Sequence, residues 1–510
     1  MSDSAKWLMA TAGALLIVWS GALGMPFAQD DFVFLAAVMP GGPGLGAVVN
    51  WRHGWFRPLS QGLVLGGLAR VLPPEPVLFH AAALALYLAA AGALFFVVRR
   101  LSGSAGLAGL AAFLWGGRSA HFLAVAWVSA VQDVVMALLS FAALGAAVSG
   151  GGASAGAGRG KAPARAVLVT ALALAALLSK ETAVVLPVIV GAVLYVRSGG
   201  AVRAVVRRPE VLGAAGATLL WAVLRLVSGG LASQVGVQAE VEGVHRVAVN
   251  VVAWPLMFFD VNREFLRVAV LGAWPAGGVW LMAWAAAAGS LVLSLVGARL
   301  LAGRAEADGR RPGGVGCDRR LLVAAAVWGM AGALPPLLHT RAFYGYFMLL
   351  SDGGWCLMAA EGLRALWWRA GLEVSHRDRG RKARIVAAAS LLAIGMLSFC
   401  SIRFQIEAPA GLFQRAVRTE AGLQRLKAAH PAFPPGAVVV IEDLSADSEA
   451  DARLWRALGW GAALPVLYGD GAMRVFSAFQ PLGEQAFPPG SRIERLSIKH
   501  FVNVTVRGTP

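Results

Sequence analysis

Runs of about twenty apolar residues recur along this chain and limit its fold more than any other feature. Of its 510 residues, 58% are hydrophobic and 14% are charged, and the mean hydropathy is +0.66. A helix needs about twenty apolar residues to cross a bilayer. Only helices or closed barrels satisfy backbone polar groups in lipid, and these runs lack the alternation of barrel strands. The sequence therefore predicts an all-α polytopic membrane protein.

We expect about eleven transmembrane helices, of which the first is retained because no convincing cleavage site follows it. The loop after it, 27–76, is polar, rich in Gly, Pro and Trp, and long for a connection between spans. Segment 247–260 is apolar but short, so a re-entrant or interfacial helix is expected there. The expected spans are 7–25, 80–98, 105–115, 127–148, 166–178, 184–196, 211–226, 277–296, 321–338, 346–360 and 385–399.

The formal net charge is +17, and its distribution indicates orientation in the membrane rather than nucleic-acid binding. The basic residues gather in alternating loops, the pattern of cytoplasmic loops in polytopic proteins. This places the N-terminus in the cytoplasm and the loop 27–76 and the C-terminus outside. The Ala-, Gly- and Arg-rich composition favours a bacterial inner membrane, with a periplasmic C-terminal domain. The basic loops carry Arg99 and Arg100; Arg159, Lys161 and Arg165; Arg197 to Arg208; Arg304 to Arg320; and Arg377 to Arg384.

The composition changes after residue 402. Residues 437–444 (AVVVIEDL) predict a buried strand, and residues 500–506 (HFVNVTV) alternate like a half-buried one. Between them, 446–458 begins with capping residues and predicts a helix. We therefore expect a transmembrane catalytic domain over 1–402 and a small extracytoplasmic α/β domain over 403–510.

Conspicuous polar and aromatic residues gather at the outer ends of the expected spans. A single loop acid is usually only solvated, and Lys180 and Glu181 also fit a plain turn, but charge inside an apolar helix, as at Asp133, is expensive and usually functional. Their convergence on one face favours a working site. The set comprises Asp30, Asp31, Arg57, His121, Gln132, Asp133, Lys180, Glu181, Arg341, Tyr344 and Tyr346.

Five motifs in order resemble one family of membrane enzymes. They read AQDDFVF, WFRPLSQGLVL, HFLAVAWVSAVQDVVMALL, LLSKETAVVLPVIV and RAFYGYFMLL. Over about 7–360 the chain resembles the type-C (GT-C) glycosyltransferases, in the branch of the tetratricopeptide-repeat O-mannosyltransferases and their bacterial relatives. That branch usually has His-Pro-x-His-x-Glu where this chain has Arg118, Ser119, Phe122 and Leu123 around His121.

The resemblance implies transfer of a hexose, such as mannose, from a polyprenyl-phosphate donor to an acceptor hydroxyl at the outer membrane face. Asp30 or Asp31 would be the general base, and two neighbouring carboxylates repel, which raises one pKa. Lys180, Arg341 and Arg57 would stabilise the leaving phosphate. The substrate-binding candidates are His121, Gln132, Asp133, Glu181, Tyr344 and Tyr346. The expected partners are the lipid-linked sugar, membrane lipid and an acceptor glycan, lipid or protein.

Cofactors and alternative functions stay open at this point. No His or Cys set has ligand spacing, and Cys317, Cys356 and Cys400 fit apolar faces, so no metal site is assigned although a divalent metal remains open. A lipid-linked glycan ligase or polymerase would use a diphosphate donor. A transporter without chemistry would show matching halves with broken spans, and no such symmetry is visible.

Overall fold

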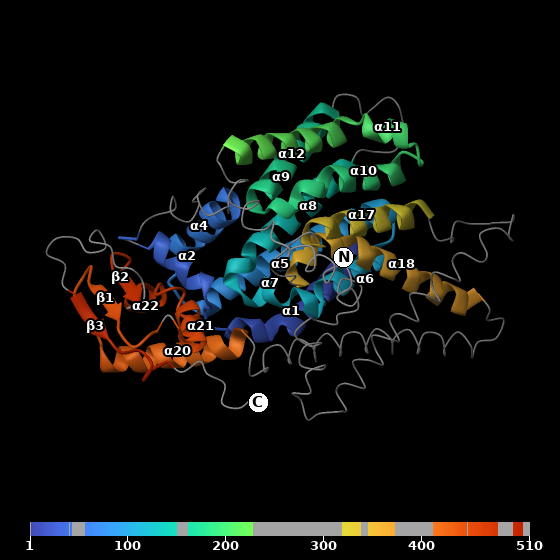
Figure 1. Ribbon diagram of the computed structural model, residues 1–510. Coiled ribbons are helices and arrows are strands. Elements are labelled where there is room, and N and C mark those ends of the chain that lie inside the picture. The colour runs from blue at the N-terminus through green and yellow to red at the C-terminus, as the bar shows by residue number, and fades with distance from the viewer. Residues whose placement is uncertain are drawn as a thin grey trace. The chain divides into compact units, whose positions relative to one another are not determined.

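The structure is a computed structural model that describes residues 2–39, 41–42, 57–149, 162–227, 319–337, 345–372, 412–445, 447–477 and 493–502. The chain divides into two compact units, which are described separately (Figure 1). Unit 1 comprises Met1–Val18, Leu86–Leu123 and Asp133–Ile402. Unit 2 comprises Trp19–Ala85, Ala124–Gln132 and Arg403–Pro510.

Unit 1 is helical throughout its described residues. Its helices pack in the order α6, α18, α17, α10, α12 and α9, each against the next. The elements that lie wholly or largely in this unit are α1 (Asp3–Trp19), α5 (Pro76–Ser102), α6 (Ala105–Gly116), η4 (Ser119–His121), α8 (Val131–Val148), α9 (Ala162–Ser179), η7 (Glu181–Val185), α10 (Leu186–Arg197), α11 (Val202–Val206), α12 (Pro209–Val227), α17 (Arg319–Leu337), η8 (Gly345–Met348) and α18 (Leu349–Leu372).

Small residues bring α17 and α18 close together. A Cβ on Gly354 would lie 2.5 Å from the carbonyl oxygen of Ala325, and one on Gly332 would lie 2.7 Å from Cα of Ser351. Helices in lipid associate through such close backbone approach, because lipid tails provide no hydrophobic drive between them. The glycines in the two sequences therefore fix which faces meet.

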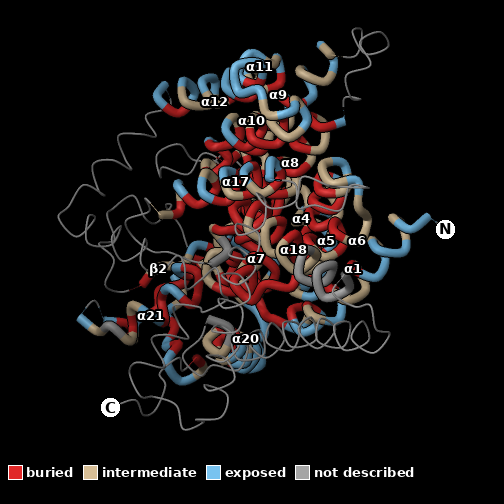
Figure 2. Tube along the Cα trace, turned by 90° about the vertical axis from the view of Figure 1, so that its right-hand side faces the viewer, coloured by how far each residue is buried: buried red, intermediate tan, exposed pale blue. Residues whose placement is uncertain are grey.

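Six helices among the described residues are long and apolar enough to cross a bilayer, which makes the chain an integral membrane protein. They are Asp3–Gly24, Pro76–Ser102, Val128–Val148, Ala162–Ser179, Pro209–Val227 and Arg319–Leu337. On α12, Leu219 is 67% exposed and Leu226 is 61% exposed. Figure 2 shows the outer turns of α12 in the colour of exposed residues. A helix that leaves leucines uncovered in this way suits a lipid environment.

The expected count of eleven spans is not confirmed. The expected spans 105–115 and 184–196 are the twelve-residue helices α6 and α10, too short to cross by the usual helix rise. The expected span 346–360 falls within η8 and α18. Segments 247–260, 277–296 and 385–399 lie outside the described residues.

Unit 2 contains short helices and a three-stranded parallel sheet of order β2-β1-β3. The central strand β1 is VVVI with all four residues buried, as parallel sheets require. The elements of this unit are η1 (Ser20–Gly24), α2 (Asp30–Val38), the π-helix η3 (Pro58–Leu65), α4 (Gly66–Val71), α7 (Phe122–Ala126), η5 (Val128–Ala130), α20 (Leu412–Ala429), β1 (Val438–Ile441), α21 (Glu449–Ala457), α22 (Ala463–Tyr468), β2 (Arg474–Ser477) and β3 (Ile493–Leu496).

Two of the three elements expected in the C-terminal region are present. The strand expected over 437–444 is β1, and the helix expected over 446–458 is α21, which Ser448 caps by accepting the N–H of Asp451. The strand expected over 500–506 is not found where it is described: residues 499–501 form a turn, and 503–506 lie outside the described residues. The strands beside β1 are β2 and β3, and in β3 only the last residue, Leu496, is buried. A separate domain over 403–510 stays a prediction, because these residues cluster with the first part of the chain.

Candidate functional site

Three of the five sequence motifs meet within unit 2. Residues 28–31 from AQDDFVF, 57–61 from WFRPLSQ and 127–132 from AWVSAVQ are joined by side-chain hydrogen bonds. The indole N–H of Trp127 donates to the carbonyl of Ala28 at 3.2 Å. We call these three segments the acid-pair cluster, because Asp30 and Asp31 lie in it.

Asp31 is buried and held from two sides. Its Oδ1 accepts the backbone N–H of Ser129 at 2.7 Å and also the Ser129 hydroxyl. Its Oδ2 accepts the N–H of Ala28 at 2.9 Å, and the residue is 1% exposed. Burial raises the pKa of the Asp31 carboxyl to about 7, against the lowering effect of these hydrogen bonds. Asp31 thus links the segment before α2 to the segment before α8.

Asp30 is the more available of the two acids. It is the first residue of α2, is only partly buried, and forms no hydrogen bond or ion pair with any described residue. Burial raises the pKa of its carboxyl from the ordinary 3.8. Gln29, directly before it, has φ 46°, which is the left-handed region that side chains rarely adopt. Strain of this kind persists where surrounding structure enforces it, and it clusters at functional sites.

Arg57 is joined to the same cluster by a hydrogen bond to the side-chain amide of Gln132. Its Nη1 donates to Oε1 of Gln132 at 2.7 Å, and Nε2 of Gln61 donates to the same oxygen at 3.1 Å. Arg57 is 1% exposed and caps the π-helix η3, in which Pro58 is the first residue. π-Helices are rare in proteins, and those that occur are often found at functional sites. Gln132 follows Ser129 by one helical turn, so one segment holds both Asp31 and Arg57.

Lys180 and Asp133 form a buried ion pair in unit 1. The Lys180 ammonium lies 2.5 Å from Oδ1 and 2.6 Å from Oδ2 of Asp133, with the side chains 3% and 0% exposed. The ammonium also lies 4.4 Å from the centre of the Phe347 ring. The pair explains the charge inside α8, because a buried carboxylate is tolerated when a cation matches it.

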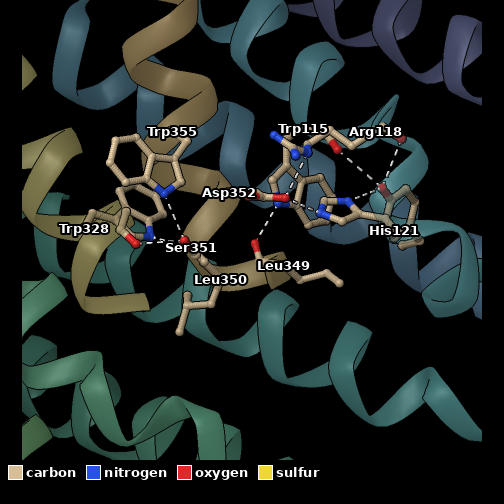
Figure 3. Close-up of polar contacts among 12 residues, drawn as sticks. Trp115, Arg118, His121, Trp328, Leu349, Leu350, Ser351, Asp352 and Trp355 are labelled. Carbon is tan, nitrogen blue, oxygen red and sulfur yellow. Dashed lines mark hydrogen bonds and ion pairs between the residues drawn. The ribbon is translucent and has the colours of Figure 1, made fainter. Parts of the chain in front are cut away.

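His121 lies in a second buried polar network of unit 1, shown in Figure 3. Its Nε2 is 2.9 Å from Oδ2 of Asp352, and its Nδ1 is 2.8 Å from the hydroxyl of Tyr87. Arg118 Nε lies 3.0 Å from the same Asp352 oxygen. A carboxylate only accepts, so Nε2 of His121 donates to it. His121 is 0% exposed, and its contact with Asp352 links η4 to α18.

Indole donors fix the chain next to Asp352. Trp115 donates to the carbonyl of Leu349 and Trp328 donates to that of Leu350, both at 2.8 Å. The Ser351 hydroxyl donates to the carbonyl of Gly329 at 2.7 Å. Figure 3 shows these contacts in a row that leads to Asp352. They tie the first turn of α18, next to Asp352, to α6 and α17.

The sequence-predicted site residues are therefore divided. Asp30, Asp31, Arg57 and Gln132 come together in unit 2. In unit 1, Asp133 meets Lys180 and His121 meets Asp352, while Glu181 starts η7 and Tyr346 lies in η8. Arg341 and Tyr344 lie outside the described residues. The roles assigned to all of these residues stay predictions.

Sequence reasoning missed Ser129, Tyr87 and Asp352, which make the main hydrogen bonds of the two clusters. Asp352 had a usable signal, since it is an acid next to the apolar run FMLL, as Asp133 is an acid within one. Ser129 and Tyr87 had none, because single hydroxyls are common in apolar segments. Within the described parts of the chain, no three His, Cys, Asp or Glu side chains are grouped to hold a metal ion.

Comparison with known proteins gives a weak structural likeness. No family model and no curated protein matches the chain. The chain is similar to the crystal structure of the Archaeoglobus fulgidus oligosaccharyltransferase in the apo form, with 14% identity and a TM-score of 0.46 over 94% of this chain and 65% of that one. The same enzyme tethered to an acceptor peptide with the NVT sequon gives 13% and 0.46, over 94% and 64%.

The complex of that oligosaccharyltransferase with Zn and sulfate gives 13% identity and a TM-score of 0.43, over 93% of this chain and 62% of that one. The chain thus spans 62% to 65% of the length of these structures. With TM-scores this low, the likeness by itself establishes neither a fold nor an activity for this chain.

Proposed function

We propose that the chain is an integral-membrane glycosyltransferase. It would move a hexose from a polyprenyl-phosphate donor to an acceptor hydroxyl at the outer membrane face. The observation that carries the proposal is the acid-pair cluster, in which hydrogen bonds join the segment of Asp30 and Asp31 to the 127–132 segment, and the 127–132 segment to Arg57. Asp31 has both carboxylate oxygens bound, and Asp30 beside it has neither bound by a described residue.

Asp30 is the general base in this proposal. An alcohol is a poor nucleophile at neutral pH, so a base must accept its proton as the new glycosidic bond forms. A base needs a free lone pair within hydrogen-bond reach of that proton. The carboxylate of Asp30 is bound by no described residue, whereas both oxygens of Asp31 accept from Ala28 and Ser129. Asp31 is then a positioning residue that fixes the backbone around Asp30.

Arg57 and Arg341 are the proposed cations for the leaving lipid phosphate. Negative charge grows on that phosphate as the sugar leaves, and a forked guanidinium suits its oxygens. Arg57 supports this role because it belongs to the acid-pair cluster. Lys180 is the less suitable candidate, because its buried pairing with Asp133 leaves that pair without net charge.

The packing of unit 2 supports the proposed topology. A Cβ on Gly459 would lie 2.6 Å from the carbonyl oxygen of Gln29, and one on Gly41 would lie 3.0 Å from the backbone nitrogen of Ala472. The loop after the first span and the C-terminal region touch at both ends of α2, which supports placing both on the same side of the membrane. With a cytoplasmic N-terminus, that side is the outer one.

Mass spectrometry of glycoconjugates tests the function. Cells that make the wild-type protein should contain a hexosylated product that cells without it lack, and the polyprenyl-phosphate sugar should accumulate in the latter. Asp30→Asn should resemble the deletion, while Asp447→Asn, at an exposed acid of the C-terminal region, should resemble the wild type. Identical glycoconjugates in all four strains would refute a glycosyltransferase. An altered lipid distribution without new glycosidic bonds would indicate a transporter instead.

A further inference from the structure

The loop Gly459–Trp460–Gly461 has a backbone unlike the rest of the described chain. Its three residues have φ values of 57°, 53° and 94° in succession. Among the described residues other than glycine, only Trp460 and Gln29 have positive φ. A tryptophan costs about 1–2 kcal/mol in this region relative to an ordinary conformation. Something in the fold must therefore enforce it.

Packing on both flanks enforces this conformation. A Cβ on Gly459 would lie 2.6 Å from the carbonyl oxygen of Gln29 and 2.9 Å from Cβ of Phe32. A Cβ on Gly461 would lie 2.8 Å from the ring of Trp455 and 2.9 Å from Cβ of Val475. The loop is thus packed between α2 and the sheet. Trp460 directly follows Gly459, which packs against Gln29, so the two residues with positive φ, Trp460 and Gln29, both adjoin this contact.

Backbone hydrogen bonds make the loop rigid. The N–H of Trp460 donates to the carbonyl of Trp455 at 2.9 Å, and the N–H of Gly461 donates to that of Leu458 at 3.1 Å. The Gly459 carbonyl accepts the N–H of Ala462 at 3.0 Å. Such a turn presents its central side chain in one direction at little further loss of entropy.

The side chain that this rigid turn presents is not used inside the described fold. Trp460 is 48% exposed, whereas its neighbour Trp455 is 4% exposed and belongs to the core. The Trp460 indole makes no hydrogen bond, ring contact or ion pair with the described residues. It carries a large π-face and one N–H donor, which together suit a ligand that is apolar on one face and hydroxylated at its edge.

We propose that Trp460 is a stacking platform for a sugar ring of the acceptor, so that the acceptor is a glycan or a glycolipid rather than a bare peptide. This inference rests on the proposed transferase function. The face of a pyranose presents C–H groups with partial positive charge, which match the negative face of an indole. The Gly459 contact places the loop against Gln29, directly before Asp30, where the acceptor hydroxyl would meet its base.

A binding experiment without turnover tests this inference. Purified full-length protein in detergent is applied to an array of immobilised mono- to tetrasaccharides of glucose, galactose, mannose and N-acetylglucosamine. The wild type should bind at least one glycan, Trp460→Ala should bind it about tenfold more weakly, and Trp460→Phe should lose less. Ile493→Ala is the control, since Ile493 is 46% exposed in β3 of the same unit, and it should bind like the wild type.

Two further measurements separate the possible outcomes. Asp30→Asn should bind the same glycan normally, because stacking needs no base. If the wild type binds the glycan through Trp460 but forms no hexosylated product, the proposed transferase function fails while the glycan platform stands. Absent or Trp460-independent glycan binding overturns the inference. Vesicles of phosphatidylethanolamine and phosphatidylglycerol give the remaining arm: if Trp460→Ala weakens vesicle binding and leaves glycan binding unchanged, Trp460 is an interfacial anchor.

Discussion

At the scale of single residues, the two neighbouring acids have different environments and should fail in different ways. We expect Asp30→Asn to lower transfer by a factor of about 100 to 10,000, the usual contribution of a positioned general base. Its thermal stability should stay near that of the wild type, since the carboxylate holds no described residue. Turnover of a polyprenyl-phosphate sugar by purified protein measures the first effect, and unfolding in the same detergent measures the second.

Asp31→Asn should lower thermal stability more than it lowers transfer. The amide can still accept from Ser129 through its oxygen, but its NH₂ group would then face the N–H of Ala28. A buried donor without an acceptor costs about 1–3 kcal/mol, so a clear fall in the unfolding midpoint is expected. If Asp31→Asn keeps full stability and Asp30→Asn keeps full activity, the assignment of base and positioning residue is wrong.

The pH dependence of transfer follows from the same burial. Desolvation raises the pKa of Asp30, which means that the carboxylate takes up a proton at a higher pH than an ordinary aspartate with a pKa of 3.8. The base works only when ionised, so kcat/KM should fall as the pH is lowered, with a midpoint above 3.8. Donor affinity measured over the same range is the control. A flat profile down to pH 4, with unchanged donor affinity, would contradict a carboxylate base.

At the scale of elements, the Lys180–Asp133 pair joins the end of α9 to the start of α8. Lys180→Met should destabilise the protein by about 3–5 kcal/mol, because it leaves a buried carboxylate unmatched. The double variant Lys180→Met with Asp133→Leu should recover most of this loss. Chemical unfolding in detergent gives the two stabilities. Equal instability of the single and double variants would show that the charges do not act as a pair. Loss of activity in a double variant that has recovered its stability would support Lys180 as a phosphate ligand.

Local pattern predicted the elements of this fold far better than their partners. Apolar runs predicted all six spanning helices, because such a helix is recognised from the length and hydrophobicity of one run of consecutive residues. The pairing of His121 with Asp352 and of Lys180 with Asp133 joins residues far apart in the chain, and no periodicity encodes it. The left-handed turn at Trp460 was equally hidden, since tertiary packing rather than local preference enforces it.

At the scale of the whole molecule, the contact between α2 and the C-terminal region should be required for stability. Gly459→Ala and Gly436→Ala each place a side chain at positive φ, with φ of 57° and 68°, at a cost of about 1–2 kcal/mol. Only at Gly459 would the new Cβ also overlap the carbonyl of Gln29, whereas nothing lies within 4 Å at Gly436. Gly459→Ala should therefore lose about 1–3 kcal/mol more and also lower transfer. Equal melting of the two variants would show that the contact contributes nothing.

Membrane topology can be checked on intact spheroplasts. In a variant without Cys317, Cys356 and Cys400, a cysteine in place of the exposed Ser445 should react with a membrane-impermeant thiol reagent. A cysteine in place of the exposed Ala201, in a basic loop, should react only after lysis. Labelling of Ala201→Cys and protection of Ser445→Cys would invert the orientation.

The contact of Gly459 with Gln29 also determines when the site can form during synthesis of the chain. A ribosome delivers the segment with the acid pair before the loop that packs against it, with an interval on the order of tens of seconds at ordinary elongation rates. During that interval the spans are already in lipid, while the strained conformation of Gln29 has no Gly459 to hold it. A chain that ended before residue 459 would be inserted in the membrane yet would lack the contact that holds Gln29 in its strained conformation.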